Sequence, residues 1–368
     1  MATLEDIIPW NDWFSFESYK PLIIAGPCSA ENEKQVLDTA IELEKTNQVK
    51  IFRAGIWKPR TRPGNFEGVG ETGLKWLQKV QAETRLKTAV EVAFPNHVKA
   101  CLDHNVDILW IGARTTANPL MVQELANSLE GVDIPVLIKN PVNPDLSLWI
   151  GAIERFYKTG NRKLAAVHRG FFPFESTSLR NIPKWELVIE LKRRFPKLNI
   201  FNDPSHISGN REFIQGISQK ALDLNMNGLM IESHISPQLA KSDAQQQITP
   251  AQLAVLLQKL SFRKANNLSD QDRNILEQYR EQIDSIDSQL LELLSQRMSV
   301  VSEIGKYKCE NDITILQLRR WENIIKTRTE LGKSMGMDDV FVLKLLQLIH
   351  KESIQKQNLI MESMQKSK

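Results

Sequence analysis

Residues 21–53 read PLIIAGPCSAENEKQVLDTAIELEKTNQVKIFR, and this stretch indicates the fold of most of the chain. Pro21–Ala25 is a short apolar run, Glu33–Thr46 has the spacing of an amphipathic helix, and Val49–Arg53 is a second β-rich run. A strand, a helix and another strand in this order form the unit from which parallel sheets are built. We therefore expect a parallel sheet covered by helices.

The same alternation continues to about Phe262, with a further helical segment at Pro183–Phe195. The two runs above are followed by six more predicted strands: Lys87–Val92, Ile108–Ile111, Pro135–Lys139, Leu164–His168, Asn199–Asn202 and Gly228–Glu232. Eight strands in about 240 residues fit the size of a (β/α)8 TIM barrel. An open doubly wound α/β sheet is the alternative, but it normally has fewer strands, and no Gly-x-Gly-x-x-Gly turn directly follows any of these runs.

A change in composition after Phe262 marks a second domain. The β-rich runs and the prolines disappear, and Gln, Glu, Leu and Lys become frequent with helical spacing. With a linker at Asn266–Asp270, the expected domains are residues 1–265, the barrel, and residues 266–368, an all-α domain.

Three helices are predicted in the second domain. The first begins near Ser269, which can cap it, and runs to about Lys308, while Leu316–Leu331 and Asp338–Met364 form the others. The apolar positions of the first helix keep to one stripe. A helix of roughly forty residues is far longer than average and cannot cover its stripe on two shorter helices, so we expect an intertwined homodimer.

The overall composition excludes several classes of protein. Hydrophobic residues make up 42% of the 368 residues, but no run approaches the roughly eighteen apolar residues of a membrane helix. Met1–Lys20 lacks the basic start and apolar run of a signal peptide, so a cytoplasmic protein is expected. Cys28, Cys101 and Cys309 are too scattered for a disulfide framework. A net charge of +3 is too small to favour nucleic acid as a partner.

Unusual polar residues stand at or just after the ends of the predicted strands. They are Cys28, Arg53, Lys58, Glu91, Arg114, Lys139, Arg169, Asp203, His206 and Glu232. In a barrel these ends converge on the face where active sites are built. Five of the ten are Arg or Lys, which suit carboxylates and phosphates. The expected substrates are small, phosphorylated and strongly anionic.

A metal site is predicted among the same residues. Cys28, His206, Glu232 and Asp243 offer a thiolate, an imidazole and two carboxylates. This mixture suits a divalent transition ion such as Mn²⁺ better than calcium or magnesium. Taken singly, a buried Cys is more often a core residue and a His more often a structural one. Their shared location favours the metal.

Seven segments between Leu22 and Thr249 resemble the 3-deoxy-D-arabino-heptulosonate-7-phosphate (DAHP) synthases in their compact form. They are Ala25-Gly26-Pro27-Cys28-Ser29, Arg53 to Gly70 with Lys58-Pro59-Arg60-Thr61, Gly112-Ala113-Arg114, Lys139, Arg169-Gly170, Asn202-Asp203-Pro204-Ser205-His206, and Glu232 with Ser242-Asp243. The resemblance implies condensation of phosphoenolpyruvate with erythrose 4-phosphate.

The resemblance also implies roles for single residues. Cys28, His206, Glu232 and Asp243 match the metal ligands of the family. Phosphoenolpyruvate contacts correspond to Arg53, Lys58, Arg114, Lys139 and Arg169, with Asp203 beside them. Arg60 and Thr61 match the contacts to the sugar phosphate, and Lys58 is the first candidate for proton transfer. Two alternatives remain, a related synthase that uses arabinose 5-phosphate and a metal-dependent aldolase.

The segment from Tyr279 to Gln357 resembles the all-helical chorismate mutases. The family's ligand-binding positions correspond to Arg280, Arg297, Lys308, Arg320, Ser353 and Gln357. The resemblance implies that chorismate is rearranged to prephenate, with arginines on its carboxylates and with Lys308 and Gln357 at its ether oxygen.

Two positions depart from the mutase pattern. Gln317 stands where relatives often have Asp, and Trp321 stands where a Glu commonly meets the substrate hydroxyl. A second hypothesis is therefore that the domain is mainly a sensor, and a third is that its charges are only solvated. The first predicted strand begins near Pro21, and we expect no regulatory extension before it. If the synthase is feedback-controlled, this domain is the expected place for the inhibitor, with prephenate as the expected inhibitor.

Overall fold

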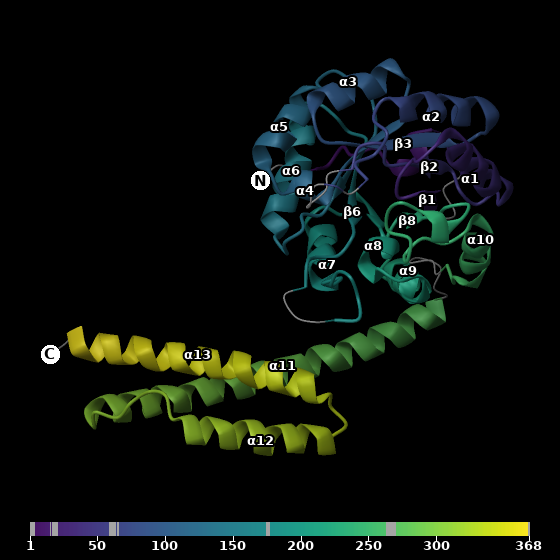
Figure 1. Ribbon diagram of the computed structural model, residues 1–368. Helices are drawn as coiled ribbons and strands as arrows, with labels where there is room; N and C mark the ends of the chain where they lie inside the picture. Colours follow the sequence, from purple (N-terminus) through teal and green to yellow (C-terminus); the bar gives the residue numbers. More distant parts are fainter. Residues whose placement is uncertain are drawn as a thin grey trace. The chain divides into compact units, whose positions relative to one another are not determined.

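The computed structural model describes residues 4–14, 16, 21–58, 64, 66–173, 177–262 and 270–366. The chain divides into two compact units, Met1–Ala265 and Asn266–Lys368. In Figure 1 the first unit is a ring of strands enclosed by helices, and the second consists of long helices. No helix of the described residues is long and apolar enough to cross a membrane.

Eight parallel strands close into a barrel in the order in which they follow along the chain. They are β1 (Leu22–Gly26), β2 (Ile51–Arg53), β3 (Lys87–Val92), β4 (Ile108–Ile111), β5 (Val136–Lys139), β6 (Leu164–His168), β7 (Asn199–Asn202) and β8 (Gly228–Glu232). The ring closes where β1 pairs with β8, from Leu22 beside Gly228 to Gly26 beside Glu232. The predicted (β/α)8 barrel is therefore confirmed.

Helices surround this ring in the positions that the alternating pattern predicts (Figure 1). They are α1 (Glu33–Lys45), α2 (Thr72–Glu83), α3 (Pro95–Asp103), α4 (Ala113–Thr116), α5 (Pro119–Asn127), α6 (Leu146–Lys158), α7 (Trp185–Arg194), α8 (Pro204–Ser208), α9 (Ile214–Asp223) and α10 (Pro250–Lys259). Local sequence explains several starts: the Asn32 side chain caps α1, and Thr249 and Gln252 form a capping box on α10.

Two apolar layers hold the barrel together. The larger one lies between strands and helices and includes the fully buried Trp149 and Phe156. The smaller one fills the inside of the ring with side chains such as Trp110 and Phe201. A packed interior of this kind is typical of the fold and leaves the chemistry to the ends of the strands.

The N-terminal segment closes the amino end of the ring. The backbone N–H of Trp10 donates to Asn199 Oδ1 over 3.1 Å, and Asn199 is the first residue of β7. The ring of Trp13 meets Phe201 edge-on with 6.2 Å between centroids. Both tryptophans are buried. Since this end is covered, the carboxyl ends of the strands remain for a site.

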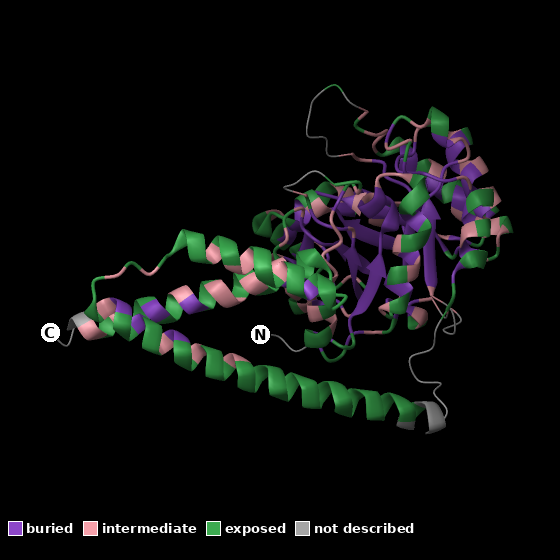
Figure 2. Cartoon of the chain, turned by 90° about the horizontal axis from the view of Figure 1, so that it is seen from below, coloured by how far each residue is buried: buried purple, intermediate pink, exposed green. Residues whose placement is uncertain are grey.

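The second unit consists of α11 (Asp270–Glu310), α12 (Leu318–Ser334) and α13 (Asp339–Lys366). The three predicted helices are therefore confirmed, and α13 packs against both others. Figure 2 shows that most of α11 is exposed. Its exposed residues include the apolar side chains of Ile283, Ile286, Leu290 and Leu293, each more than half accessible.

Candidate active site and metal cluster

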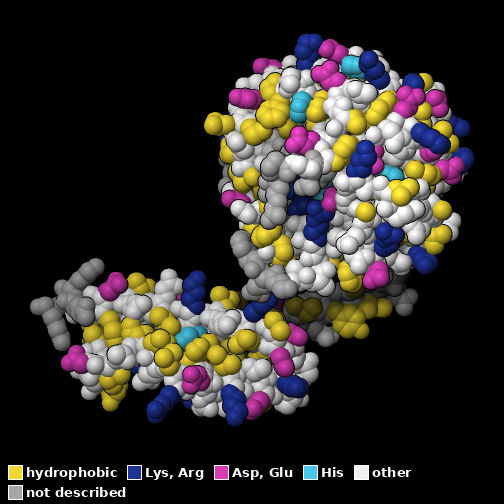
Figure 3. Space-filling view, in the orientation of Figure 1, with side chains coloured by type: hydrophobic (Ala, Val, Ile, Leu, Met, Phe, Trp, Pro, Cys, Tyr) yellow, Lys and Arg dark blue, Asp and Glu magenta, His cyan; other side chains and the backbone are white. Residues whose placement is uncertain are grey.

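A cavity of about 280 Å³ lies at the carboxyl ends of the strands. Figure 3 shows Lys and Arg side chains gathered in a hollow of the barrel. Among the described residues, the basic ones that line the cavity are Lys58, Arg114, Lys139, Arg169 and Arg180. Four of these five belong to the predicted phosphoenolpyruvate site, and the structure brings them together around one space.

Regular elements hold most of these cations in place. Lys139 is the last residue of β5, Arg169 follows the last residue of β6, and Arg114 lies in α4, which begins directly after β4 and Gly112. Arg169 is fixed further, because its Nη1 donates to Asn181 Oδ1 over 2.8 Å. Burial lowers the pKa of Arg169 to about 10, so the side chain stays charged at neutral pH.

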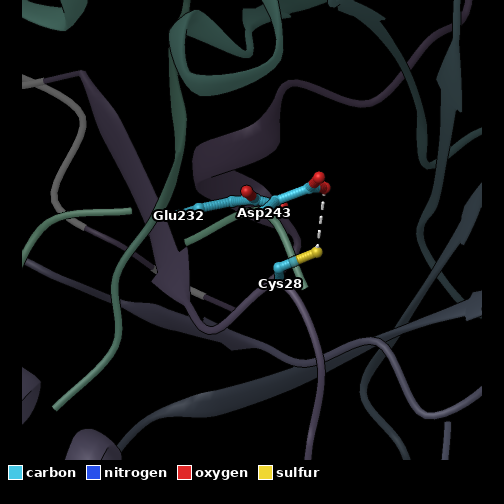
Figure 4. Close-up of side chains that lie close together, drawn as sticks. All are labelled: Cys28, Glu232 and Asp243. Carbon is cyan, nitrogen blue, oxygen red and sulfur yellow. Dashed lines mark hydrogen bonds between the residues drawn. The ribbon is translucent and has the colours of Figure 1, made fainter. Parts of the chain in front are cut away.

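Three of the four predicted metal ligands form a tight cluster. One ligand atom each from Cys28, Glu232 and Asp243 lies within 4.8 Å of the other two. Figure 4 shows the Cys28 thiol pointing to the Asp243 carboxylate, with Sγ 3.3 Å from Oδ2. Asp243 adopts a left-handed backbone conformation, with φ 51°, which Asp tolerates better than most residues.

These residues fit a divalent metal ion. Glu232 is completely buried, yet its Oε1 accepts no hydrogen bond from the described residues. A buried carboxylate oxygen without a donor is costly unless cations stabilise it. Arg53, whose Nη1 lies 3.4 Å from Oε1, supplies one positive charge, and a metal ion would supply a second one together with a direct bond. Burial and the nearby Glu232 raise the pKa of the Cys28 thiol to about 12, against the charge of Lys58. A bound metal overcomes such a shift, because it takes the thiolate as its ligand.

His206, the fourth predicted ligand, lies beside this cluster. It is not a member, because membership requires a ligand atom within 4.8 Å of the atoms of all other members. Its Nε2 is 3.7 Å from Glu232 Oε1, and its Nδ1 is 2.8 Å from Asp203 Oδ2. Burial lowers the pKa of His206, which favours the neutral ring. A carboxylate at Nδ1 favours the tautomer that leaves the Nε2 lone pair free for a metal.

Three of the remaining predicted residues are cations that lie close to oxygen or sulfur atoms of the site. Lys58 Nζ lies 2.9 Å from the Cys28 carbonyl oxygen and 3.2 Å from its Sγ. Arg53 Nη1 is 3.4 Å from Glu232 Oε1 beneath the cavity. Lys139 Nζ is 2.7 Å from Asp203 Oδ2. Arg60 and Thr61, the predicted contacts to the sugar phosphate, lie outside the described residues.

Sequence reasoning missed Arg180 and Gln246. Arg180 Nη1 donates to Asp243 Oδ1 over 2.9 Å and to Gln246 Oε1 over 2.6 Å. The amide of the buried Gln246 donates to Glu232 Oε2 over 2.6 Å. Neither residue stands at the end of a strand, so the pattern that indicated the other residues gave no signal here.

In the helical unit, three of the six predicted ligand positions are in contact. Arg297 Nη1 donates to Ser353 Oγ over 2.6 Å, and Gln357 Nε2 donates to the Ser353 carbonyl oxygen over 3.3 Å. Lys308 is buried, and its Nζ donates to the Ile315 carbonyl oxygen over 2.6 Å.

The other two positions and the two departures have different surroundings. Arg280 and Arg320 are exposed, and Arg280 pairs with Glu277 over 3.1 Å. Trp321 stacks on His350, with 3.9 Å between ring centroids and 7° between planes. Gln317 precedes the first residue of α12 without capping it through its side chain.

Comparisons with known proteins agree with both units. Residues 14–265 match the DAHP synthetase I family, and residues 279–358 match the chorismate mutase type II family. A phospho-2-dehydro-3-deoxyheptonate aldolase of Thermotoga maritima is 29% identical over 226 residues, which are 61% of this chain and 64% of that protein. A 2-dehydro-3-deoxyphosphooctonate aldolase of Protochlamydia amoebophila is 28% identical over 249 residues, or 63% of this chain and 87% of that one.

The fold agrees as well. The crystal structure of the Thermotoga maritima DAHP synthase matches with a TM-score of 0.59 and 29% identity, covering 65% of this chain and 67% of that chain. A truncated form of the Thermotoga maritima enzyme matches with a TM-score of 0.56 and 26% identity, covering 65% and 84%. With a barrel that matches over residues 14–265 and a mutase-type helical unit after it, the chain belongs to the DAHP synthetase I family.

Proposed function

We propose that the barrel condenses phosphoenolpyruvate with erythrose 4-phosphate to DAHP, with a divalent metal ion held by Cys28, His206, Glu232 and Asp243. The observation that carries this proposal is the cluster of a thiol and two carboxylates at a cavity lined by basic side chains. A mixed sulfur and oxygen set favours manganese or a similar ion over calcium.

The basic residues bind and orient the two anionic substrates. Arg53, Lys58, Arg114, Lys139 and Arg169 are assigned to the carboxylate and phosphate of phosphoenolpyruvate, and Arg60 with Thr61 to the phosphate of the sugar. Carbon 3 of phosphoenolpyruvate bonds to the aldehyde carbon, water adds at carbon 2, and phosphate leaves. The metal supplies Lewis acidity toward the aldehyde when it is bound.

Lys58 is the proposed proton donor to the oxygen of the former aldehyde. Burial alone would lower its pKa, but Cys28 and Glu91 raise it, so the ammonium form prevails at neutral pH. A charged lysine at this place also holds the phosphate of phosphoenolpyruvate before it leaves. Asp203 keeps Lys139 in position through their 2.7 Å ion pair.

An assay of the purified chain with both substrates tests this function. DAHP should form, a chelator should abolish the activity, and Mn²⁺ should restore it. Cys28→Ala should weaken Mn²⁺ binding at least about 100-fold, because one of four ligands is lost. Cys101→Ala is the matched control, since Cys101 is also buried but belongs to the packed core. Unchanged metal affinity in Cys28→Ala would remove Cys28 from the ligand set.

The choice of sugar separates this proposal from its nearest rival. The Protochlamydia relative is a phosphooctonate aldolase, so arabinose 5-phosphate is the substrate to compare. We expect a higher kcat/KM with erythrose 4-phosphate, and Arg60→Ala should impair use of the sugar phosphate more than use of phosphoenolpyruvate. A higher kcat/KM with arabinose 5-phosphate would assign the barrel to the rival reaction.

We also propose that the helical unit rearranges chorismate to prephenate as a homodimer and that prephenate inhibits the barrel. Contacts of Ser353 with Arg297 and Gln357, together with the burial of Lys308, support a site for a dicarboxylate. The exposed apolar side chains of α11 support association of two copies. A site that controls the barrel must bind prephenate with different affinity in two arrangements of the protein.

Two measurements test this second activity. Chorismate should be converted to prephenate by the intact chain, and prephenate should lower the rate of DAHP formation. A chain cut near Asn267 should keep DAHP synthesis and lose the inhibition. Inhibition that survives the cut would place the inhibitor on the barrel, and a chain that never converts chorismate would leave only the sensor hypothesis.

A further inference from the structure

Arg180 reaches the metal cluster from a segment that carries no strand. It lies between β6 and α7, and its backbone is held by a hydrogen bond from its N–H to the Ser208 carbonyl oxygen over 3.2 Å. One guanidinium nitrogen, Nη1, serves both Asp243 Oδ1 and Gln246 Oε1. The side chain is 44% exposed, so it is not part of the packed core.

Gln246 extends this contact to the second carboxylate. It is 1% exposed, and both ends of its amide are used, since Oε1 accepts from Arg180 and Nε2 donates to Glu232 Oε2. Arg180 and Gln246 therefore connect Asp243 with Glu232 by three hydrogen bonds of 2.6 to 2.9 Å.

Arg180 and Gln246 each bind one oxygen of a carboxylate, and the other oxygen of that carboxylate faces the metal cluster. The oxygen of Asp243 that faces Cys28 is Oδ2, and Arg180 holds Oδ1. Gln246 holds Oε2 of Glu232, whereas Oε1 receives no hydrogen bond from the described residues. Oδ2 also meets the Cys28 thiol, and Oε1 lies 3.4 Å from Arg53 Nη1. Because rotation of either carboxylate would break the bonds to Arg180 and Gln246, these two oxygens keep their directions toward the cluster.

We propose that Arg180 and Gln246 are positioning residues that fix Asp243 and Glu232 for metal binding. The inference rests on the proposed metal site and adds to it the layer behind the ligands. Groups that hydrogen-bond to metal ligands fix their orientation, and removing one typically weakens metal affinity by about 10- to 100-fold. Here a single arginine acts on both carboxylates, on one directly and on the other through Gln246.

The test measures Mn²⁺ affinity of the full chain by equilibrium dialysis without substrates. Arg180→Met removes the donor while keeping most of the aliphatic volume, and we expect Mn²⁺ binding about 10- to 100-fold weaker than in the wild type. Gln246→Met should weaken it as well. Arg180→Lys keeps one donor and should restore part of the affinity. The absorption spectrum of the Co²⁺-loaded protein reports on the ligand geometry independently of activity.

Arg211→Met is the matched control. Arg211 contacts the same loop as Arg180, but among the described residues its side chain bonds only to the carbonyl oxygens of Ala244 and Gln245. If Arg180→Met loses affinity and Arg211→Met does not, the effect comes from the carboxylates and not from the loop as a whole.

The outcomes separate the two levels of the proposal. Wild-type protein that fails to bind Mn²⁺ or Co²⁺ overturns the metal site and this inference together. Wild-type protein that binds tightly, with Arg180→Met and Gln246→Met binding equally tightly and giving the same Co²⁺ spectrum, overturns the positioning role alone. Equal losses in Arg180→Met and Arg211→Met would likewise reduce Arg180 to a support of the loop.

Discussion

The barrel and the helical unit differ in how each covers its apolar surface. In the barrel every strand has two neighbours, and the strands are buried almost throughout. In the helical unit, α11 leaves Ile283, Ile286, Leu290 and Leu293 exposed (Figure 2). A closed ring completes its own core, whereas three elongated helices do not enclose one.

The same difference extends to the sites. All described members of the barrel site lie around one cavity or directly beside it. In the helical unit Arg297 and Ser353 are in contact, but Arg280 is exposed and pairs only with Glu277 among the contacts described. The described residues of the barrel thus meet within a single chain, whereas in the helical unit the proposed association of two copies would complete the site.

The largest effect is expected on the stability of the barrel, at the pairing of β1 with β8 that closes the ring. A Cβ on Gly228 would lie 2.1 Å from the Leu22 carbonyl oxygen, in the pairing of β1 with β8. Gly228→Ala should lower the free energy of unfolding of the barrel by about 5 kcal/mol, measured by urea denaturation. Gly216→Ala on α9 is the control, since nothing lies within 4 Å of its added Cβ. A loss of less than about 1 kcal/mol in Gly228→Ala would mean that β1 and β8 can move apart to accept the added Cβ.

A charge among the exposed apolar side chains of α11 should affect the association and activity of the helical unit and leave the barrel unchanged. Leu290→Asp places a carboxylate in the proposed dimer contact, and we expect monomers in analytical ultracentrifugation and a roughly 1,000-fold loss of chorismate turnover. DAHP synthesis without inhibitor should stay within about twofold. Ser295→Asp, on the opposite side of α11, should change neither. Dimers that persist in Leu290→Asp would contradict the proposal that the exposed apolar side chains of α11 form the dimer contact.

A smaller loss is expected within the mutase-type site. Arg297→Ala removes a charged donor assigned to a carboxylate of chorismate and should lower kcat/KM for chorismate about 100-fold. Sensitivity to prephenate should fall with it if one site serves both ligands. The exposed Arg328 on α12 provides the control substitution, Arg328→Ala. Inhibition that remains unchanged in Arg297→Ala would separate the inhibitor from the substrate site.

The smallest effect concerns the pH dependence of barrel stability. His168 is fully buried, its Nε2 donates to the Pro183 carbonyl oxygen, and its Nδ1 accepts from Asn202. Burial lowers the pKa of His168 to about 4, so the unfolded chain takes up this proton at higher pH than the folded one. This contribution to stability is present above the unfolded pKa of about 6.5 and is lost as the pH falls toward 4.

Between pH 7 and about pH 5.5 the loss should come to about 1 kcal/mol. Urea denaturation at the two pH values measures it, and His168→Gln should remove this part of the difference. A variant with the same difference as the wild type would assign the pH dependence to other groups.

The regular elements could be predicted closely because periodic patterns specify them. The predicted strands Lys87–Val92, Ile108–Ile111 and Leu164–His168 agree with β3, β4 and β6 residue for residue. The end of Pro183–Phe195 differs by one residue from that of α7. In each case a short β-rich run or a helical spacing carries the information locally.

The site could be predicted where it follows those patterns or where a segment resembles a known family, as at Asp243. Lys139 and Arg169 were found because they end or follow strands, whereas Arg180 and Gln246 meet across 66 positions between irregular segments. No local pattern specifies such a contact. The surroundings of Arg280 could not be predicted either, since its sequence position indicated a ligand but not that it is exposed and pairs with Glu277.

The N-terminal segment that closes the amino end of the ring can pack there only after much later parts of the chain have been synthesised. Trp10 bonds to a residue 189 positions further on, and the ring itself closes only when β8 joins β1. During synthesis, the first tryptophans leave the ribosome long before their partners exist. Contacts between positions so far apart slow folding, because a long loop must close before any of them forms. The N-terminal segment therefore joins the barrel late, although it is synthesised before its partners.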